Sequence, residues 1–204
     1  MVLAGNNLFG NNNFFKSSAE DSQTMVWNGQ RWIAGDFGLV SKKLSYGTNA
    51  NDASIGTVAW LNLAGPGSAF VYPLAAAGAT TDYSVKLIIG GSIVGDNLAR
   101  GISIPVASWQ DFTYGNSQEL WGNFIDPTIV NNANFGVAFS GYGPGAGSAI
   151  SNYVTFTNFN FNIPANAVIT GVSLDIKLYG LPTPTIGIAY EDPVYLTVHY
   201  IGVD

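Results

Sequence analysis

Residues Thr170–Leu178, TGVSLDIKL, alternate along their whole length between mostly apolar side chains and small or charged ones. The positions on one side of this alternation are Thr170, Val172, Leu174, Ile176 and Leu178. Those on the other side are Gly171, Ser173, Asp175 and Lys177. Because successive side chains of a strand point to opposite faces of its sheet, this stretch predicts a β-strand with one face in the core and the other in solvent.

The last part of the chain, Val194–Tyr200 or VYLTVHY, repeats the pattern. Its core-facing residues are expected to be Val194, Leu196, Val198 and Tyr200. Its other residues, Tyr195, Thr197 and His199, are expected on the opposite face. Further strands are predicted at Tyr83–Ile89, which Gly90-Gly91 turns into Ser92–Val94, and at Asn134–Ser140.

Such segments amount to roughly ten short strands separated by turns, and the sequence has no long stretch with the period of a helix. The fold class predicted is therefore all-β, an antiparallel two-sheet β-sandwich of jelly-roll-like type, with an extended N-terminal arm and a hairpin. One short helix is expected after Asp126, a favourable N-cap residue, because Pro127 suits the first helical position.

The alternation changes phase between Tyr153 and Ile163. Val154 and Phe156 share one parity, whereas Phe159, Phe161 and Ile163 share the other. If one face stays buried, an extra residue must be accommodated near Thr157-Asn158. This predicts a bulge, or a bend between the two sheets.

The first part of the chain is predicted to be separate from the sandwich. Residues 1–22 are rich in Asn and carry the apolar side chains of Phe9, Phe14 and Phe15. They are either a frayed terminus or an arm that becomes ordered against a partner. Residues 23–52 form a hairpin and linker region, in which Asn28-Gly29 favours a two-residue turn flanked by Trp27 and Trp32. The sandwich domain is expected over residues 53–204.

Composition excludes several classes of function. Charged residues make up only 10%, against about 25% in ordinary soluble domains. The net charge of −6 argues against a nucleic-acid partner, because phosphate binding depends on clustered Lys and Arg. The absence of Cys excludes disulfides and thiolate chemistry. We expect no signal peptide, because Met1–Asn7 contain no basic region and no apolar core segment. We expect no transmembrane segment and no membrane partner, because the uncharged stretches are interrupted by Gly, Pro and Asn.

Catalytic and metal sites are not expected. His199 is the single His, so a Ser-His-Asp or His-metal site would have to use it, and its place on a regular strand favours a surface or interface role. A glycosidase needs two paired carboxylates. The candidates lie in no recognisable motif: Asp82, Asp96, Asp111, Glu119, Asp126, Glu191 and Asp192. An acidic turn could hold calcium, although no EF-hand spacing is present. We therefore predict a non-enzymatic protein without cofactor or metal.

The five Trp residues have two interpretations. Exposed indoles could stack on sugar rings, or the side chains could belong to the core and to cross-strand pairs. We favour a core location for Trp60 and Trp121 and a cross-strand pair of Trp27 with Trp32. Trp109 follows a loop region and is the best candidate for an exposed glycan-binding platform.

Several stretches resemble a β-sandwich module of bacteriophage and prophage virion structural proteins, most of them uncharacterised. They are Val85–Ala99, Tyr114-Gly115, Leu120–Gly122, Asn134–Val137, Phe161–Pro164, Ala167–Val172 and Val194–Tyr200. The order of the segments differs from that of the module, as in a permutation, which a sandwich with neighbouring termini tolerates. The resemblance implies a sandwich fold and a virion location, and it carries no catalytic or ligand residues.

These observations lead to one expected function and one alternative. We expect a non-enzymatic virion structural protein, a capsid decoration or cement protein or a tail or fibre component, which forms a homotrimer and contacts other virion proteins. Phe9, Phe14, Phe15, Trp27 and Trp32 would dock it, and the low-charge sandwich faces would contact other subunits. The alternative is a module at a fibre tip that binds host-surface glycan through Trp109.

Overall fold

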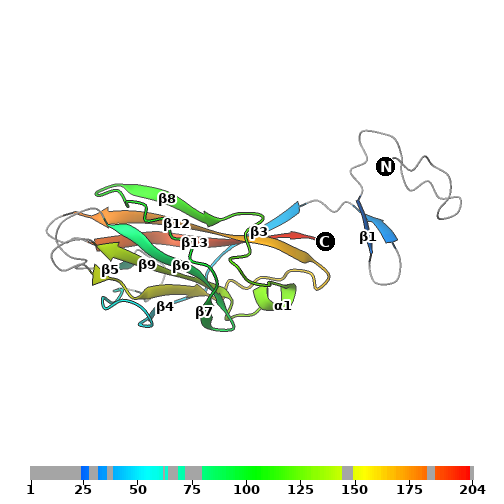
Figure 1. Cartoon of the computed structure of the whole chain (residues 1–204), viewed down its shortest axis with the longest axis horizontal. Coiled ribbons are helices and arrows are strands. Elements are labelled where there is room, and N and C mark those ends of the chain that lie inside the picture. Colours follow the sequence, from blue (N-terminus) through cyan, green and yellow to red (C-terminus); the bar gives the residue numbers. More distant parts are fainter. Residues whose placement is uncertain are drawn as a thin grey trace, which may run out of the picture. The chain divides into compact units, whose positions relative to one another are not determined.

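The computed structural model describes residues 24–27, 32–35, 39–61, 63, 69–71, 80–143, 149–182 and 187–202. The chain forms two compact units, Met1–Gly38 and Leu39–Gly202. Figure 1 shows the strands of both units. Each unit is described below by itself.

The first unit contains an antiparallel hairpin of β1 (Thr24–Trp27) and β2 (Trp32–Gly35). Trp27 lies opposite Trp32, which confirms the predicted hairpin and its cross-strand pair. Asn28 and Gly29 lie outside the described residues, so the predicted two-residue turn stays a prediction. Phe9, Phe14 and Phe15 lie outside the described residues, so the docking arm stays a prediction.

The second unit is an antiparallel β-sandwich, as predicted, with its two sheets stacked as layers (Figure 1). The six-stranded sheet has the order β4 (Thr48–Asp52), β11 (Tyr153–Thr157), β9 (Gly136–Gly143), β6 (Thr81–Ile89), β7 (Ser92–Val94), with β10 (Ala149–Ile150) paired to β9. The five-stranded sheet has the order β3 (Leu39–Ser45), β13 (Gly187–Ile201), β12 (Val168–Leu181), β8 (Trp109–Gly115), with β5 (Ala69–Val71) paired to β13.

The sandwich begins at Leu39 and not at residue 53 as expected. β3 pairs with β13 along its whole length, and β4 pairs with β11, so the expected linker supplies one strand to each sheet. The alternation of β3 is weak because its inward positions include Lys42 and its outward positions include Leu39. That composition suits a sheet edge, where lysines discourage pairing with another chain.

The core lies between the two sheets and follows the predicted alternation. Its residues from β12 and β13 are at most 4% exposed: Val172, Leu174, Ile176, Leu178, Val194, Leu196, Val198 and Tyr200. Trp60 and Trp121 are buried as predicted, at 4% and 0% exposure. Each indole donates its N–H to a backbone oxygen, Trp60 to Asn152 at 2.8 Å and Trp121 to Val172 at 2.9 Å. Burying these aromatic rings therefore leaves neither indole N–H unpaired.

The phase change after Tyr153 is a bend between the sheets, as predicted. β11 ends at Thr157, and Asn158 and Asn160 have φ angles of 57° and 60°, a region that Asn enters more readily than most residues. Phe159, Phe161 and Ile163 beyond the bend are all at most 5% exposed. The chain then enters β12 in the other sheet, so both parities point into one core.

Two local predictions are also confirmed. The helix α1 (Pro127–Val130) begins after Asp126, whose carboxylate accepts the N–H of Ile129 at 2.9 Å. The Gly90-Gly91 turn places Ile89 opposite Ser92, with φ angles of 59° and 84° that a type I′ turn requires of its two central residues.

Substitution of two leucines tests which side of the five-stranded sheet faces the core. Leu174→Ala is expected to lower the free energy of unfolding by about 2–5 kcal/mol, because Leu174 is fully buried and the change leaves a cavity. Leu39→Ala, at a position 55% exposed, is expected to cost less than about 0.5 kcal/mol. Urea unfolding of both variants measures the difference, and equal losses would contradict the placement of the core.

Candidate functional site

The solvent-facing side of the five-stranded sheet, called the outer face below, carries the candidate site. Strand pairing places its residues in rows that cross β3, β13, β12 and β8. The first row consists of Leu39, Ile201 and Val168, which are direct partners on three neighbouring strands. Their exposed fractions are 55%, 37% and 63%. This apolar row lies at the end of the sheet where β3 begins and β13 ends.

The second element of the outer face is His199, which lies between two serine hydroxyls. Its Nδ1 is 2.8 Å from Ser41 Oγ and its Nε2 is 3.1 Å from Ser173 Oγ. Partial burial lowers the pKa of His199 below its ordinary value, and the nearby Asp175 offsets part of this shift. The lowered pKa favours the neutral imidazole, in which one ring nitrogen donates and the other accepts.

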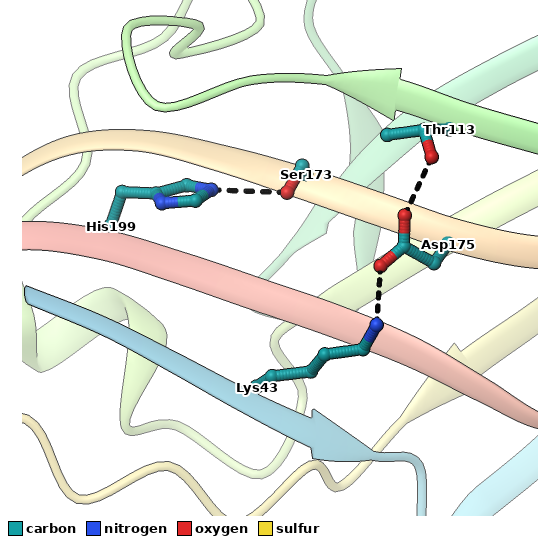
Figure 2. A network of polar contacts seen from close by, with 5 residues as sticks. All are labelled: Lys43, Thr113, Ser173, Asp175 and His199. Atoms are coloured by element: carbon teal, nitrogen blue, oxygen red, sulfur yellow. Dashed lines mark hydrogen bonds and ion pairs between the residues drawn. The ribbon is translucent and has the colours of Figure 1, made fainter.

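The third element is an ion pair beside the histidine (Figure 2). Lys43 Nζ lies 2.7 Å from Asp175 Oδ2, and Thr113 donates its hydroxyl to Asp175 Oδ1 at 2.7 Å. The Lys43 ammonium also lies 4.6 Å from the centre of the Tyr195 ring. Asp175 thus bonds Lys43 and Thr113 through its two oxygens, whereas the carboxylate of a Ser-His-Asp triad would orient the histidine.

Beyond this ion pair the outer face contains an open hollow of about 530 Å³. Its charged lining residues are Lys43, Asp111, Asp175, Lys177, Glu191 and Asp192. Lys177 Nζ lies 2.6 Å from a Glu191 carboxylate oxygen, and this hydrogen bond raises the pKa of the lysine. The hollow combines carboxylates, ammonium groups and the Thr113 hydroxyl within one depression.

A bulge in β13 builds this hollow. Asp175 pairs with Tyr195, but Lys177 pairs with Glu191, so three residues of β13 oppose Ile176 alone. The bulge contains a cis Asp192-Pro193 bond, and the Tyr46 hydroxyl donates to Asp192 Oδ1. Burial raises the pKa of Tyr46 above its ordinary value, and the bond to Asp192 adds to the shift. The phenol therefore stays a donor that ties the bulge to the turn after β3.

At the far end of the outer face lies an aromatic pair. Trp109 on β8 is the direct partner of Tyr179 on β12, and their ring centres are 5.0 Å apart with an interplanar angle of 42°. Trp109 is 36% exposed and lies on an edge strand. The residue singled out from the sequence as a glycan platform thus faces solvent, one outward position away from Asp111 of the hollow.

Six of the seven carboxylates considered from the sequence are divided between two roles. Asp82 is 2% exposed and accepts the backbone N–H groups of Arg100 and Ile102. Glu119 accepts the N–H of Trp121 at 2.7 Å. These carboxylates, like Asp126 before α1, hold loops in place. Asp111, Glu191 and Asp192 gather at the hollow instead.

Sequence reasoning missed the apolar row and the hollow. The alternation of β12 and β13 marks Asp175, Lys177 and Ile201 as outward positions. It places Val168 on the core side with Val172 and Leu174, whereas the register shift between Ile169 and Gly171 turns Val168 outward. Which of these positions meet depends on the pairing of strands that are distant in the chain, as for Lys43 with Asp175. The outward positions other than Val168 were readable from the sequence, but their grouping was not.

Comparison of the chain with protein-family models, with curated proteins and with solved structures finds no match. Within the described part of the chain, no three His, Asp or Glu side chains converge as metal ligands. No helix among the described residues has the length and apolar character needed to cross a membrane. The outer face therefore has to be interpreted from its own geometry.

The pKa of His199 predicts how stability depends on pH. Because the folded state lowers this pKa below the ordinary value of 6.5, the unfolded chain binds the proton more readily. The contribution of His199 is present above about pH 6.5 and is lost as the pH falls through the folded-state pKa. In His199→Gln the loss of stability between about pH 7.5 and pH 5.5 is expected to be smaller than in the wild type.

The measurement is urea unfolding of both proteins at the two pH values. The carboxylates are the same in both proteins, so a difference in how much the free energy of unfolding changes with pH is due to His199. Glutamine keeps one donor and one acceptor for Ser41 and Ser173. An identical pH dependence of the two proteins would contradict the assignment.

Proposed function

We propose that this chain is a non-enzymatic structural subunit of a bacteriophage particle that assembles with copies of itself through the outer face of its sandwich. The observation that carries the proposal is the apolar row of Leu39, Ile201 and Val168, which is exposed on three neighbouring strands. Aligned exposed side chains of this kind mark contact sites more than scattered single ones do.

The distribution of charge around the apolar row supports this use. Next to the apolar row lie Ser41 and His199, and among the outward strand positions the formal charges begin only at Lys43 and Asp175. Centres of protein interfaces are depleted of charge, and their rims are polar. The end of the outer face near the apolar row thus has the composition of an interface centre, and a second copy of the chain is its proposed partner.

The virion location is supported by the likeness of Val85–Ala99 and the other quoted segments to virion β-sandwich modules. The low charged fraction of 10% agrees with a subunit whose surface is largely covered in an assembly. The bonding of Asp175 to Lys43 and Thr113 instead of His199 supports a role without catalysis. The glycan-binding alternative is taken up in the next subsection, because a different part of the outer face favours it.

Self-assembly is tested with the double variant Leu39→Ser and Ile201→Ser. The wild type is expected to sediment as a homotrimer at micromolar concentration, and the variant as a monomer, because two apolar contacts per subunit are lost. Sedimentation equilibrium measures the mass. Leu61→Ser, a change at another exposed leucine, is the control and should leave the mass unchanged. A wild type that is monomeric throughout would contradict self-assembly.

Particle association is tested with a chain that lacks residues 1–21. This segment includes Phe9, Phe14 and Phe15, and the sandwich forms its own compact unit from Leu39 onward. The full chain is expected to be present in purified particles of the phage that encodes it. The truncated chain should lose that association while its melting temperature stays within about 2 °C of the full chain. Mass spectrometry of particles and scanning calorimetry give the two readouts, and absence of the full chain from particles would refute the proposal.

A further inference from the structure

We infer that the hollow and the adjoining Trp109–Tyr179 pair form a binding site for uncharged pyranose units of a polysaccharide. This inference concerns the opposite end of the outer face from the apolar row, and it does not rest on the proposed assembly function. It follows from three features of the site: its shape, its hydrogen-bonding groups and its exposed aromatic ring.

The shape is that of a preformed site. The volume of about 530 Å³ falls in the range of small-molecule sites, roughly 300–1,000 Å³. Its lining comes from four strands, β12, β13, β8 and β3. The bulge at Asp192-Pro193 is tied down by Tyr46, so the depression is held by paired strands and not by a free loop.

The polar groups suit sugar hydroxyls, which both donate and accept hydrogen bonds. The lysines Lys43 and Lys177 supply donors, and Thr113 supplies a hydroxyl. The Asp111 carboxylate lies on the exposed edge strand β8 opposite Lys177, where it can accept from a bound hydroxyl. Convergent groups of this kind fix the orientation of a ligand in a pocket.

The charge of the hollow selects among sugars. Four carboxylates, from Asp111, Asp175, Glu191 and Asp192, line it together with only two lysines. This acidic excess disfavours uronic acids, sialic acids and phosphorylated sugars, because like charges repel in a partly desolvated site. Both lysines already lie in ion pairs with Asp175 and Glu191, and we assign the site to neutral and N-acetylated hexoses, which bring hydroxyl groups without a charge.

Trp109 supplies the apolar surface that such a sugar needs. Outward residues on a strand are about 7 Å apart, so the indole lies one such step from Asp111. Contact with Tyr179 orients the ring without covering it, since 36% of Trp109 remains exposed. A sugar bound over the hollow can therefore place the apolar face of a neighbouring unit on this ring. A Trp side chain suits such a partly exposed position, because it combines a large apolar ring with one polar N–H group.

The test is affinity electrophoresis in native gels that contain dextran, laminarin, galactomannan or gel-conjugated hexa-N-acetylchitohexaose, with polygalacturonate as the charged comparison. The net charge of −6 drives the protein toward the anode, and an uncharged ligand slows it only by binding. At least one of these four neutral ligands is expected to retard the wild type. Trp109→Ala should then raise the dissociation constant at least about tenfold, as measured by titration calorimetry.

The matched control is Phe124→Ala. Phe124 is 80% exposed and lies outside the hollow, so its removal deletes an exposed aromatic ring without touching the site. This variant should bind like the wild type. Asp111→Ala, at an exposed position of β8, should also weaken binding, and it keeps the inference testable if the Trp109 variant unfolds.

Three outcomes would overturn the inference. They are no retardation by any of the four neutral ligands, unchanged affinity in both Trp109→Ala and Asp111→Ala, and retardation by polygalacturonate alone. Particle association and oligomeric mass are measured in separate experiments. A negative result for sugar binding therefore does not contradict the proposed assembly function.

Discussion

The antiparallel pairing of β12 with β13 is the interaction on which both the core and the outer face depend. The two strands pair from Val168 opposite Ile201 to Leu181 opposite Gly187. One side of this ribbon buries its apolar residues against the six-stranded sheet, and the other side carries His199, Asp175 and Lys177 to solvent. Because side chains alternate strictly, a slip of one residue would expose the core and bury these polar groups.

The irregularities of that pairing are as important as its regular parts. The shift between Asp175 and Lys177 leaves three residues of β13 opposite one of β12, and this bulge shapes the hollow. Bulges re-aim side chains and interrupt pairing, and they are common beside functional sites. The outer face therefore has two ends of different character, with the apolar row at one end and the hollow and aromatic pair at the other.

The elements read from the sequence were those with a local physical cause. The strand around Leu174 followed from its alternation, the helix after Asp126 from its cap and proline, and the bend after Phe156 from a change of parity. The strands β3 and β4 were assigned to a linker instead, because exposed polar residues on edge strands carry only weak periodicity. Trp109 was recognised as exposed, but its partner Tyr179 could not be named without the strand order.

The residue pattern was sufficient to predict a β-sandwich and the buried side of Val172–Leu178 and Val194–Tyr200, because the two-residue period of a strand is a property of neighbouring residues. The packed fold was needed to show that Lys43 meets Asp175, that His199 lies between Ser41 and Ser173, and that Leu39 adjoins Ile201. These contacts join residues far apart in the chain. Their choice depends on strand order and register, which result from packing the whole core and leave no mark in any short stretch of sequence.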